Sequence, residues 1–416
     1  MRQTVWPSVG VVLWLLAICP AVVAQRLAPL DLLEVDRCVL KAPEGYLDEF
    51  WELCVSPTNR ETIPVVHLGD SHVQGGYFSA PIRQFFDDYF CLAGLGWVAP
   101  YSLLRSNQPH PGRVSGHKGR WSGHFVTSRR YGDSPSPTGI TLTAQVRDEV
   151  EIKVPDGFPI RRVVLLRDVS TPPLYIKGAA QPAVGVSGVE EPGVDTLWVN
   201  EPTTVLTLVA PKGARWYGAS LESGCPGPLL HTIGYNGAFF PSLNHRAFLD
   251  HLHLLRPRLL IVSLGTNDLL APKFSSALFA GEVRSLVRAL QVAMPSTAIL
   301  LTSPVATFRV KRVRRGHYCW IASGNADEVS KVLEREASEL GCGYIDLYGA
   351  FGGVSGADAL PEAGMISRDG VHLTREGYDE LGMAVAYALL RDFRSYVLRR
   401  RPLFYQRQVL DISRVK

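Results

Sequence analysis

The sequence predicts an α/β domain, with a parallel sheet covered by helices on both faces, and an all-β sandwich inserted into it. At both ends of the 416-residue chain, apolar strand-like runs alternate with segments of helical spacing, which is typical of a covered parallel sheet. Between about residues 102 and 219, many short strand-like runs are separated by Pro and Gly turns, which is typical of a sandwich. The first α/β unit precedes this β region, so the β region interrupts the α/β domain.

The N-terminus has the pattern of a cleavable signal peptide. Arg2 precedes the apolar run Val9–Ile18, and Val22-Val23-Ala24 forms a cleavage site before Gln25. The apolar run is short for a membrane span, and no later stretch is long and apolar enough to cross a bilayer. We therefore expect a periplasmic or secreted protein with cleavage after Ala24. An uncleaved anchor is the alternative.

Cysteine usage fits an oxidising compartment. Beyond the signal peptide the chain has six cysteines, an even number that permits three disulfides of unknown connectivity. None lies in a CxxC motif, so we expect no zinc site. The formal net charge of +4 is small and gives no indication of a nucleic-acid partner.

Ser71 lies between a predicted buried strand and a predicted helix. The run Ile63–Gly69 is apolar and β-branched, whereas Phe78–Phe90 has helical spacing. A turn of this kind exposes the serine hydroxyl and directs backbone N–H groups at an approaching group, which suits a nucleophile. The alternative is a turn that uses Gly, Asp and Ser only for their backbone preferences.

The remaining elements follow the same alternation. The lead segment is partly helical around Leu30–Asp36 and Gly45–Cys54. In the β region we expect strands at Ile140–Val146, Val150–Val154, Arg161–Leu166, Thr196–Val199, Thr203–Val209 and Ala214–Tyr217. After it we expect strands at His231–Ile233, Leu259–Leu264, Ala298–Thr302 and Tyr344–Leu347, and helices at Ser276–Ala293, Asn325–Leu340 and Thr374–Phe393. Asn325 and Glu328 have capping-box spacing, and Gly341 ends that helix. We expect the basic residues from Arg394 onward to form a solvated tail, with contact to an anionic surface as the alternative.

Two polar motifs follow predicted strands. Ser263–Asp268 follows the strand Leu259–Leu264, and the side-chain amide of Asn267 can donate to an oxyanion. Gly234-Tyr-Asn-Gly237 follows another strand, where a glycine lets a backbone N–H approach a substrate oxygen. In each case an ordinary turn is the alternative.

A third motif precedes the last predicted helix. Asp369 and His372 lie three residues apart, so one compact turn can present both side chains to the same cleft. The imidazole can take the proton of Ser71, and the carboxylate can orient the imidazole. DxxH could also be half of a metal site, but no cluster of further ligands accompanies it.

Together the motifs resemble those of the SGNH/GDSL hydrolase superfamily. The resemblance rests on Gly69-Asp70-Ser71, a glycine after the second strand, Gly265-Thr-Asn267-Asp268 and Asp369-Gly-Val-His372, in the family's order. It covers roughly residues 61–100 and 222–395. It implies a flavodoxin-like three-layer α/β/α SGNH hydrolase domain and serine ester hydrolysis without a metal or cofactor.

The resemblance also implies a role for each matched residue. Ser71 is the nucleophile, His372 the general base, and Asp369 the group that orients His372. The oxyanion hole consists of the Ser71 backbone N–H, the Gly237 backbone N–H and the Asn267 side chain, with Gly234 as the alternative glycine. His72 departs from the pattern, because the family commonly has a small or apolar residue there.

Within this superfamily, the sequence is similar to bacterial peptidoglycan O-acetylesterases. The similarity rests on His72, the Gly-Tyr-Asn-Gly-Ala loop and the nested β region. In these esterases, a carbohydrate-binding-module-like β-sandwich follows the nucleophile motif. The implied divisions are a signal peptide (1–24), a lead segment (25–60), a first hydrolase segment (61–104), the inserted sandwich (105–221), a second hydrolase segment (222–395) and a basic tail (396–416).

The expected function is removal of O-acetyl groups from a glycan polymer through an acetyl-enzyme on Ser71. The polymer that we expect is peptidoglycan. The alternatives are an acetylesterase of plant or dietary polysaccharide, a lipase or thioesterase, and a glycan-binding protein without activity. Four aromatic residues of the β region are candidates for stacking on sugar rings, and we expect at least half of them in the core. They are Trp121, Tyr175, Trp198 and Trp216.

Overall fold

The computed structural model describes residues 33–128, 136–178, 192–314 and 317–400. The predicted signal peptide and the end of the basic tail lie outside these residues. In the described part of the chain, no helix has both the length and the hydropathy needed to cross a membrane.

A six-stranded sheet in the order β1-β18-β15-β14-β2-β13 forms the centre of the α/β domain. Its strands are β1 Leu40–Lys41, β2 Thr62–Gly69, β13 Gly227–Gly234, β14 Leu259–Ser263, β15 Ala298–Thr302 and β18 Gly343–Ile345. Five of them pair in parallel, as predicted. The exception is β1, an antiparallel edge strand that the lead segment adds and that the sequence did not predict.

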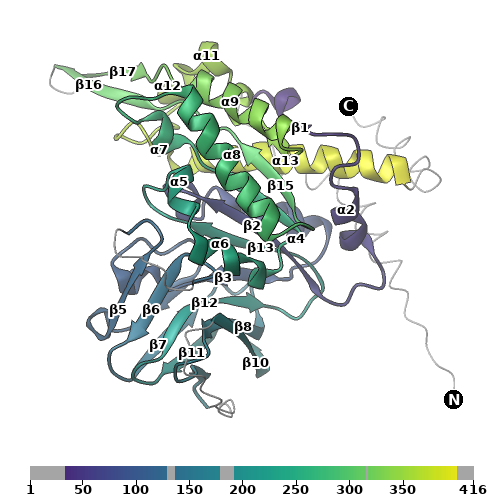
Figure 1. Ribbon diagram of the computed structural model, residues 1–416, viewed down its shortest axis with the longest axis vertical. Helices are drawn as coiled ribbons and strands as arrows, with labels where there is room; N and C mark the ends of the chain where they lie inside the picture. The colour runs from purple at the N-terminus through teal and green to yellow at the C-terminus, as the bar shows by residue number, and fades with distance from the viewer. Residues whose placement is uncertain (1–32, 129–135, 179–191, 315–316, 401–416) are drawn as a thin grey trace.

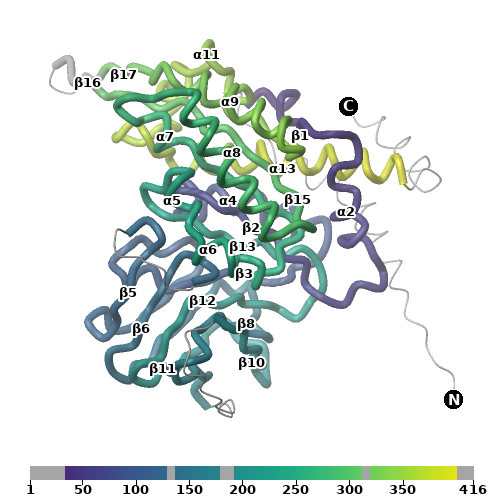
Figure 2. Tube along the Cα trace, in the orientation of Figure 1, coloured from purple at the N-terminus to yellow at the C-terminus, as the bar shows by residue number. Residues whose placement is uncertain are grey.

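Helices cover both faces of this sheet, which confirms the predicted three-layer fold. Figures 1 and 2 show α8 and α9 on one side of it and α4 and α13 on the other. The long helices are α2 Asp48–Val55, α4 Ser79–Tyr89, α8 Ser276–Ala293, α9 Ala326–Glu339 and α13 Arg375–Arg400. In α8, the side chains spaced three or four residues apart are buried, as the sequence pattern predicts: Phe279, Val283, Leu286, Val287 and Leu290.

Short helices at the ends of strands complete this domain. They are η1 Val35–Arg37, α3 Ser71–Gln74, α5 Phe240–Leu243, α6 Arg246–Leu252, η4 His253–Leu255, α7 Thr266–Leu269, α10 Leu347–Ala350, α11 Gly353–Gly356 and α12 Ala359–Glu362. Most of these elements were not predicted, because a helix of about one turn is too short to show a hydrophobic period. The helix expected around Leu30–Asp36 overlaps η1 at its last two residues, and its first three residues lie outside the described part of the chain.

The β region forms two antiparallel sheets, as predicted for a sandwich. The larger has β3 Gly94–Val98, β5 Trp121–Phe125, β6 Ile140–Ala144, β8 Ile160–Asp168, β10 Pro192–Thr203 and β12 Arg215–Glu222. The smaller has β4 Arg113–Ser115, β7 Asp148–Lys153, β9 Tyr175–Ile176 and β11 Val205–Ala210. The 3-10 turns η2 Tyr101–Leu104 and η3 Lys118–Arg120 lie between early strands. The strand β3, which precedes the expected boundary at residue 105, pairs with β12.

Two sequence predictions about helix ends were wrong. The final helix α13 continues through Arg400, and two of its arginines contact Asp48 of α2. The Arg399 Nη2–Asp48 Oδ1 distance is 2.6 Å, and the Arg400 Nε–Asp48 Oδ2 distance is 3.1 Å, so these residues are not part of a solvated tail. Asn325 precedes α9 without a side-chain cap, and its side-chain amide donates to the Leu269 carbonyl at 3.0 Å.

The described residues contain none of the three disulfides that the even number of cysteines permits. All six cysteines beyond the signal peptide are free: Cys38, Cys54, Cys91, Cys225, Cys319 and Cys342. Burial raises the pKa of the Cys38 thiol to about 12 and that of Cys342 to about 11, so both behave as small apolar core residues.

A two-stranded hairpin between β15 and α9 was not predicted from the sequence. It consists of β16 Phe308–Arg314 and β17 His317–Ala322. Figures 1 and 2 show it projecting from the body of the molecule. It follows the carboxyl end of β15, at the edge of the sheet where open α/β domains bind ligands.

Candidate active site

Three residues far apart in the sequence form a continuous chain of hydrogen bonds. The Ser71 Oγ atom lies 2.9 Å from Nε2 of His372, and His372 Nδ1 lies 2.7 Å from Oδ2 of Asp369. A carboxylate can only accept, so Nδ1 carries the proton and donates to Asp369. Nε2 of the neutral imidazole is then free to accept from the Ser71 hydroxyl. The structure therefore brings together the three residues that the sequence singled out for nucleophilic chemistry.

Asp369 is fixed by a dense set of donors within its own turn. Its Oδ1 atom accepts from the backbone N–H groups of Val371 and His372, both at 2.9 Å, and from Ser367 Oγ at 2.7 Å. Partial burial raises the pKa of this carboxyl, but the hydrogen bonds from His372 and Ser367 outweigh that effect and hold the pKa well below its usual range. Asp369 is therefore an ionised carboxylate at neutral pH and can accept the hydrogen bond from His372 Nδ1.

Ser71 is placed by a tight passage from β2 into the short helix α3. A Cβ atom on Gly69 would lie 2.4 Å from Val73 Cγ2 and 2.5 Å from the Ser263 carbonyl oxygen, so only glycine fits there. Asp70 caps the helix, because its Oδ1 atom accepts from the His72 N–H at 2.9 Å. Burial raises the pKa of Asp70 to about 7. These constraints hold Ser71 at the carboxyl end of the sheet.

The two candidate oxyanion glycines have different surroundings. A Cβ on Gly234 would lie 2.3 Å from the Gln74 nitrogen and 2.7 Å from the Asp70 carbonyl oxygen, so Gly234 packs directly on the turn that carries Ser71. Gly237 has φ +72° and is exposed, and a Cβ there would meet no atom within 4 Å. Gly234 therefore permits a close approach of backbone segments, whereas Gly237 is open to an incoming group.

Asn267 lies beside the Gly237 loop. Its Nδ2 atom donates to the Ala238 carbonyl at 2.9 Å, which ties the start of α7 to the residue after Gly237. A primary amide has two N–H groups, so one remains available for a substrate oxygen. The strand ends behind these loops are aligned, since Gly69 is the register partner of both Gly234 and Ser263.

Gln74 has a positioning contact that the sequence analysis missed. Its Oε1 atom accepts from the Asn236 N–H at 2.8 Å, and its Nε2 atom donates to Ser106 Oγ at 2.8 Å and to the Asn107 carbonyl at 3.0 Å. The side chain thereby connects α3 to the glycine loop and to the start of the β region. The only sequence signal was a polar residue one turn after Ser71.

His72 packs behind the proposed base. The His72 and His372 rings stack with centroids 5.3 Å apart and an interplanar angle of 29°. His72 Nδ1 lies 3.1 Å from the Tyr378 hydroxyl. Burial, with the nearby His372, lowers the pKa of His72 to about 3, so its ring is neutral at neutral pH.

One protein-family model matches the second half of the chain. The model of the GDSL-like Lipase/Acylhydrolase family matches residues 203–380, which include Gly237, Asn267, Asp369 and His372. Ser71 lies outside the matched residues. No curated protein matches the chain.

A peptidoglycan O-acetylesterase of known structure shares the fold over most of the chain. A peptidoglycan O-acetylesterase, 20% identical, has a TM-score of 0.70, and the match covers 86% of this chain and 99% of that one. A carbohydrate acetylesterase from Sinorhizobium meliloti, 17% identical, covers 39% of this chain and 79% of its own, with a TM-score of 0.29. The M. smegmatis aryl esterase, 18% identical, covers the same shares, also with a TM-score of 0.29.

The fold and the motifs at its strand ends resemble those of SGNH/GDSL-type hydrolases with a nested β domain. With the acylhydrolase family match, they identify the chain as a carboxylic ester hydrolase.

Proposed function

We propose that this protein is a secreted serine esterase that removes O-acetyl groups from peptidoglycan amino sugars through an acetyl-enzyme on Ser71. The observation that carries the proposal is the hydrogen-bonded chain from Ser71 through His372 to Asp369, with distances of 2.9 and 2.7 Å. The choice of substrate is supported by the fold shared with a peptidoglycan O-acetylesterase over 86% of the chain.

The proposed reaction has two steps, and in each step His372 takes up a proton and then passes it on. In the first, His372 Nε2 takes the Ser71 proton as Oγ bonds to the acetyl carbonyl carbon. Collapse of the intermediate breaks the bond to the sugar oxygen, which leaves with the proton from His372. In the second, His372 takes a proton from water, the hydroxide attacks the acetyl-enzyme, and acetate leaves as Ser71 regains its proton. Asp369 stabilises the imidazolium that forms in both steps.

The oxyanion formed in each step needs fixed donors. We assign these to the Ser71 backbone N–H, the Gly237 backbone N–H and the second N–H of the Asn267 amide. The exposed position of Gly237 supports this choice over Gly234, whose Cα faces the backbone of Asp70 and Gln74. The mechanism uses no metal or cofactor.

The proposed substrate also requires that the enzyme act outside the cytoplasmic membrane. Peptidoglycan lies outside the cytoplasmic membrane, and the predicted signal peptide over 1–24 supports export to that side. The described helices do not offer a membrane span.

Acetate release tests the proposal directly. The mature chain from Gln25, as wild type and as Ser71→Ala, is incubated with O-acetylated peptidoglycan and, in parallel, with acetylated xylan. We expect acetate from peptidoglycan with wild type only. Preference for xylan would assign a plant polysaccharide, and preference for long-acyl reporter esters would assign a lipase. Glycan binding without acetate release would contradict the esterase assignment.

A further inference from the structure

The hairpin β16–β17 is attached to the turn that carries the proposed base. The Phe308 N–H donates to the Gly370 carbonyl at 2.6 Å, and Gly370 lies between Asp369 and His372. A Cβ on Gly370 would lie 2.1 Å from the Phe308 carbonyl oxygen and 3.1 Å from Val310 Cγ2. The base of the hairpin therefore packs directly against the Asp369–His372 turn, and the rest of it projects outward (Figure 1).

The two faces of the hairpin differ. Phe308 is 3% exposed and makes an edge-to-face contact with Trp320, with ring centroids 6.1 Å apart. Arg309 and Lys311 point to the opposite face, since side chains alternate along a strand. Both are exposed, as is Ile321, which is the register partner of Arg309. We call Arg309 and Lys311 the outer face.

The outer face carries positive charge that no acidic group neutralises. The sequence from 308 to 322 has five arginines and lysines and no aspartate or glutamate. Within the described part of the chain, the side chains of Arg309 and Lys311 have no hydrogen-bond or ion-pair partner, although their backbones pair with β17. Charges left unpaired in this way can serve a partner of opposite sign.

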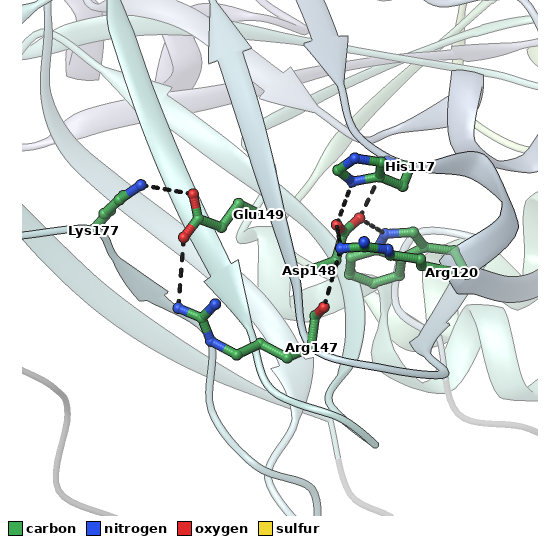
Figure 3. Close-up of polar contacts among 7 residues, drawn as sticks. His117, Arg120, Arg147, Asp148, Glu149 and Lys177 are labelled. Carbon is green, nitrogen blue, oxygen red and sulfur yellow. Dashed lines mark hydrogen bonds and ion pairs between the residues drawn. The ribbon is translucent and has the colours of Figure 1, made fainter.

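Two basic residues of the β region are paired with carboxylates, in contrast to Arg309 and Lys311. Figure 3 shows Arg120 against Asp148 and Lys177 against Glu149. The Arg120 Nη1–Asp148 Oδ1 distance is 3.1 Å, and the Lys177 Nζ–Glu149 Oε2 distance is 2.7 Å. These cations are satisfied within the protein, so the exposed pair beside the active-site turn is better placed to attract an anionic ligand.

We propose that the outer face, Arg309 and Lys311, binds carboxylate groups of an anionic glycan polymer whose acetyl ester lies at Ser71. This inference rests on the proposed function and specifies the substrate class: a polymer that carries carboxylates, as peptidoglycan does on its peptides and neutral xylan does not. Two exposed cations attract anionic groups over about 10 Å at moderate ionic strength, and they raise the local concentration of a long polymer more than that of a small neutral ester.

The test is a charge reversal, Arg309→Glu with Lys311→Glu. The substrates are O-acetylated peptidoglycan, the same polymer after its carboxyl groups have been amidated, and a small neutral acetyl ester. We expect about a tenfold loss of kcat/KM on the native polymer, mainly through KM, as two surface charge contacts are reversed. Turnover of the small ester stays unchanged, and amidation of the polymer lowers wild-type activity to the level of the variant.

Two further variants separate charge from structure. Arg309→Lys with Lys311→Arg keeps both charges and retains wild-type turnover. Arg288→Glu with Arg394→Glu reverses two exposed cations on α8 and α13, and it leaves the preference for native over amidated polymer intact. Unchanged polymer turnover in the hairpin variant would overturn the inference. So would an equal loss on the small ester, which would show that the hairpin only supports the Asp369–His372 turn.

Binding separates this inference from the proposed function. The Ser71→Ala protein, with and without the hairpin substitutions, is co-sedimented with insoluble peptidoglycan in native and amidated form. The inference predicts that the charge reversal lowers binding to the native polymer only, whatever the outcome of the acetate assay. Equal binding by both proteins would contradict the inference, whereas absence of acetate release by wild type would contradict only the proposed function.

Discussion

His372 is contacted on three sides. Its Nε2 faces the Ser71 hydroxyl, its Nδ1 donates to Asp369, and the His72 ring stacks on its face. Because burial keeps His72 neutral, this neighbour adds no positive charge beside the imidazolium that the proposed first step creates. The residue that departs from the family pattern is therefore in direct contact with the proposed base.

Asn267→Ala tests the proposed oxyanion hole. The substitution removes the free amide N–H, and loss of one such donor lowers turnover by about 10²–10³-fold. It also removes the bond to Ala238, so about 1 kcal/mol of stability is lost as well. The measurement is kcat on a small acetyl ester, together with the free energy of unfolding in urea.

A matched control for this experiment is Asn244→Ala. It removes an exposed asparagine bond to Ser285 Oγ, of 2.7 Å, and should leave kcat unchanged. If Asn267→Ala kept full turnover, the oxyanion hole would have to be assigned to other donors, even with Ser71 as the nucleophile.

At the residue scale, the motifs were predictable where each follows a strand or precedes a helix. Asn267 and the pair Asp369 and His372 lie at such places, so strand and helix patterns predicted that they would meet. Gln74 was not predictable, because its role depends on Asn236 and other loop residues that are distant in the sequence.

At the scale of elements, a buried histidine joins three of them. In β2, His67 Nδ1 lies 2.8 Å from Ser79 Oγ of α4, and Nε2 lies 2.9 Å from Ser263 Oγ of β14. Burial, with the nearby Arg83, lowers the pKa of His67 from 6.5 to about 3. The histidine is therefore neutral in the folded protein over the range in which the unfolded chain becomes protonated.

This difference makes stability depend on pH at His67. Between pH 6.5 and about 3 the unfolded state binds a proton and the folded state does not, so the contribution of His67 to stability falls as the pH falls. The slope is at most about 1.4 kcal/mol per pH unit. His67→Gln should be less stable than wild type at pH 8 but should lose less stability on going to pH 5.

Urea unfolding at several pH values measures how the stability of wild type and of His67→Gln depends on pH. The comparison with the variant isolates His67, because Asp70 and Asp268, whose pKa values burial raises to about 7, contribute an opposite slope in both proteins. Parallel pH profiles for wild type and His67→Gln would show that His67 is not the group responsible.

Elements with a full hydrophobic period were predicted from the sequence. The helix Ser276–Ala293 and the strand Ala298–Thr302 match residue for residue. The end of α13 was not predicted, because a run of arginines is typical of a charged tail and its contacts with Asp48 cannot be read from the sequence. The strand Phe308–Arg314 was also missed: its first four residues alternate apolar and basic side chains as a strand does, but the adjacent Lys311 and Arg312 interrupt the alternation.

At the scale of the whole molecule, the described part of the β region has one of the four candidate aromatic rings largely exposed. Trp121 and Trp216 are buried at 7% and 0% exposure, which confirms that at least half of the four candidates are in the core. Trp198 of β10 is 61% exposed, and the Arg162 guanidinium lies 5.8 Å from its ring centroid. Among the candidates, Trp198 is the one best placed to stack on a sugar ring.

Trp198→Ala should lower kcat/KM on O-acetylated peptidoglycan about three- to tenfold, the usual value of one aromatic contact. Turnover of a small acetyl ester should not change, since a distant contact raises the effective concentration of a polymer only. Val292→Ala removes an exposed apolar side chain from α8 and serves as the control. A loss of equal size on both substrates would indicate a structural role for Trp198.

Covalent labelling with a serine-directed organophosphorus inhibitor tests the central claim most directly. Peptide mass spectrometry of the labelled protein locates the adduct, and intact mass gives the number of adducts per chain. The account predicts one adduct, on Ser71, which is absent in Ser71→Ala and forms much more slowly in His372→Ala. An adduct on another serine, or acetyl ester turnover by purified Ser71→Ala, would contradict it.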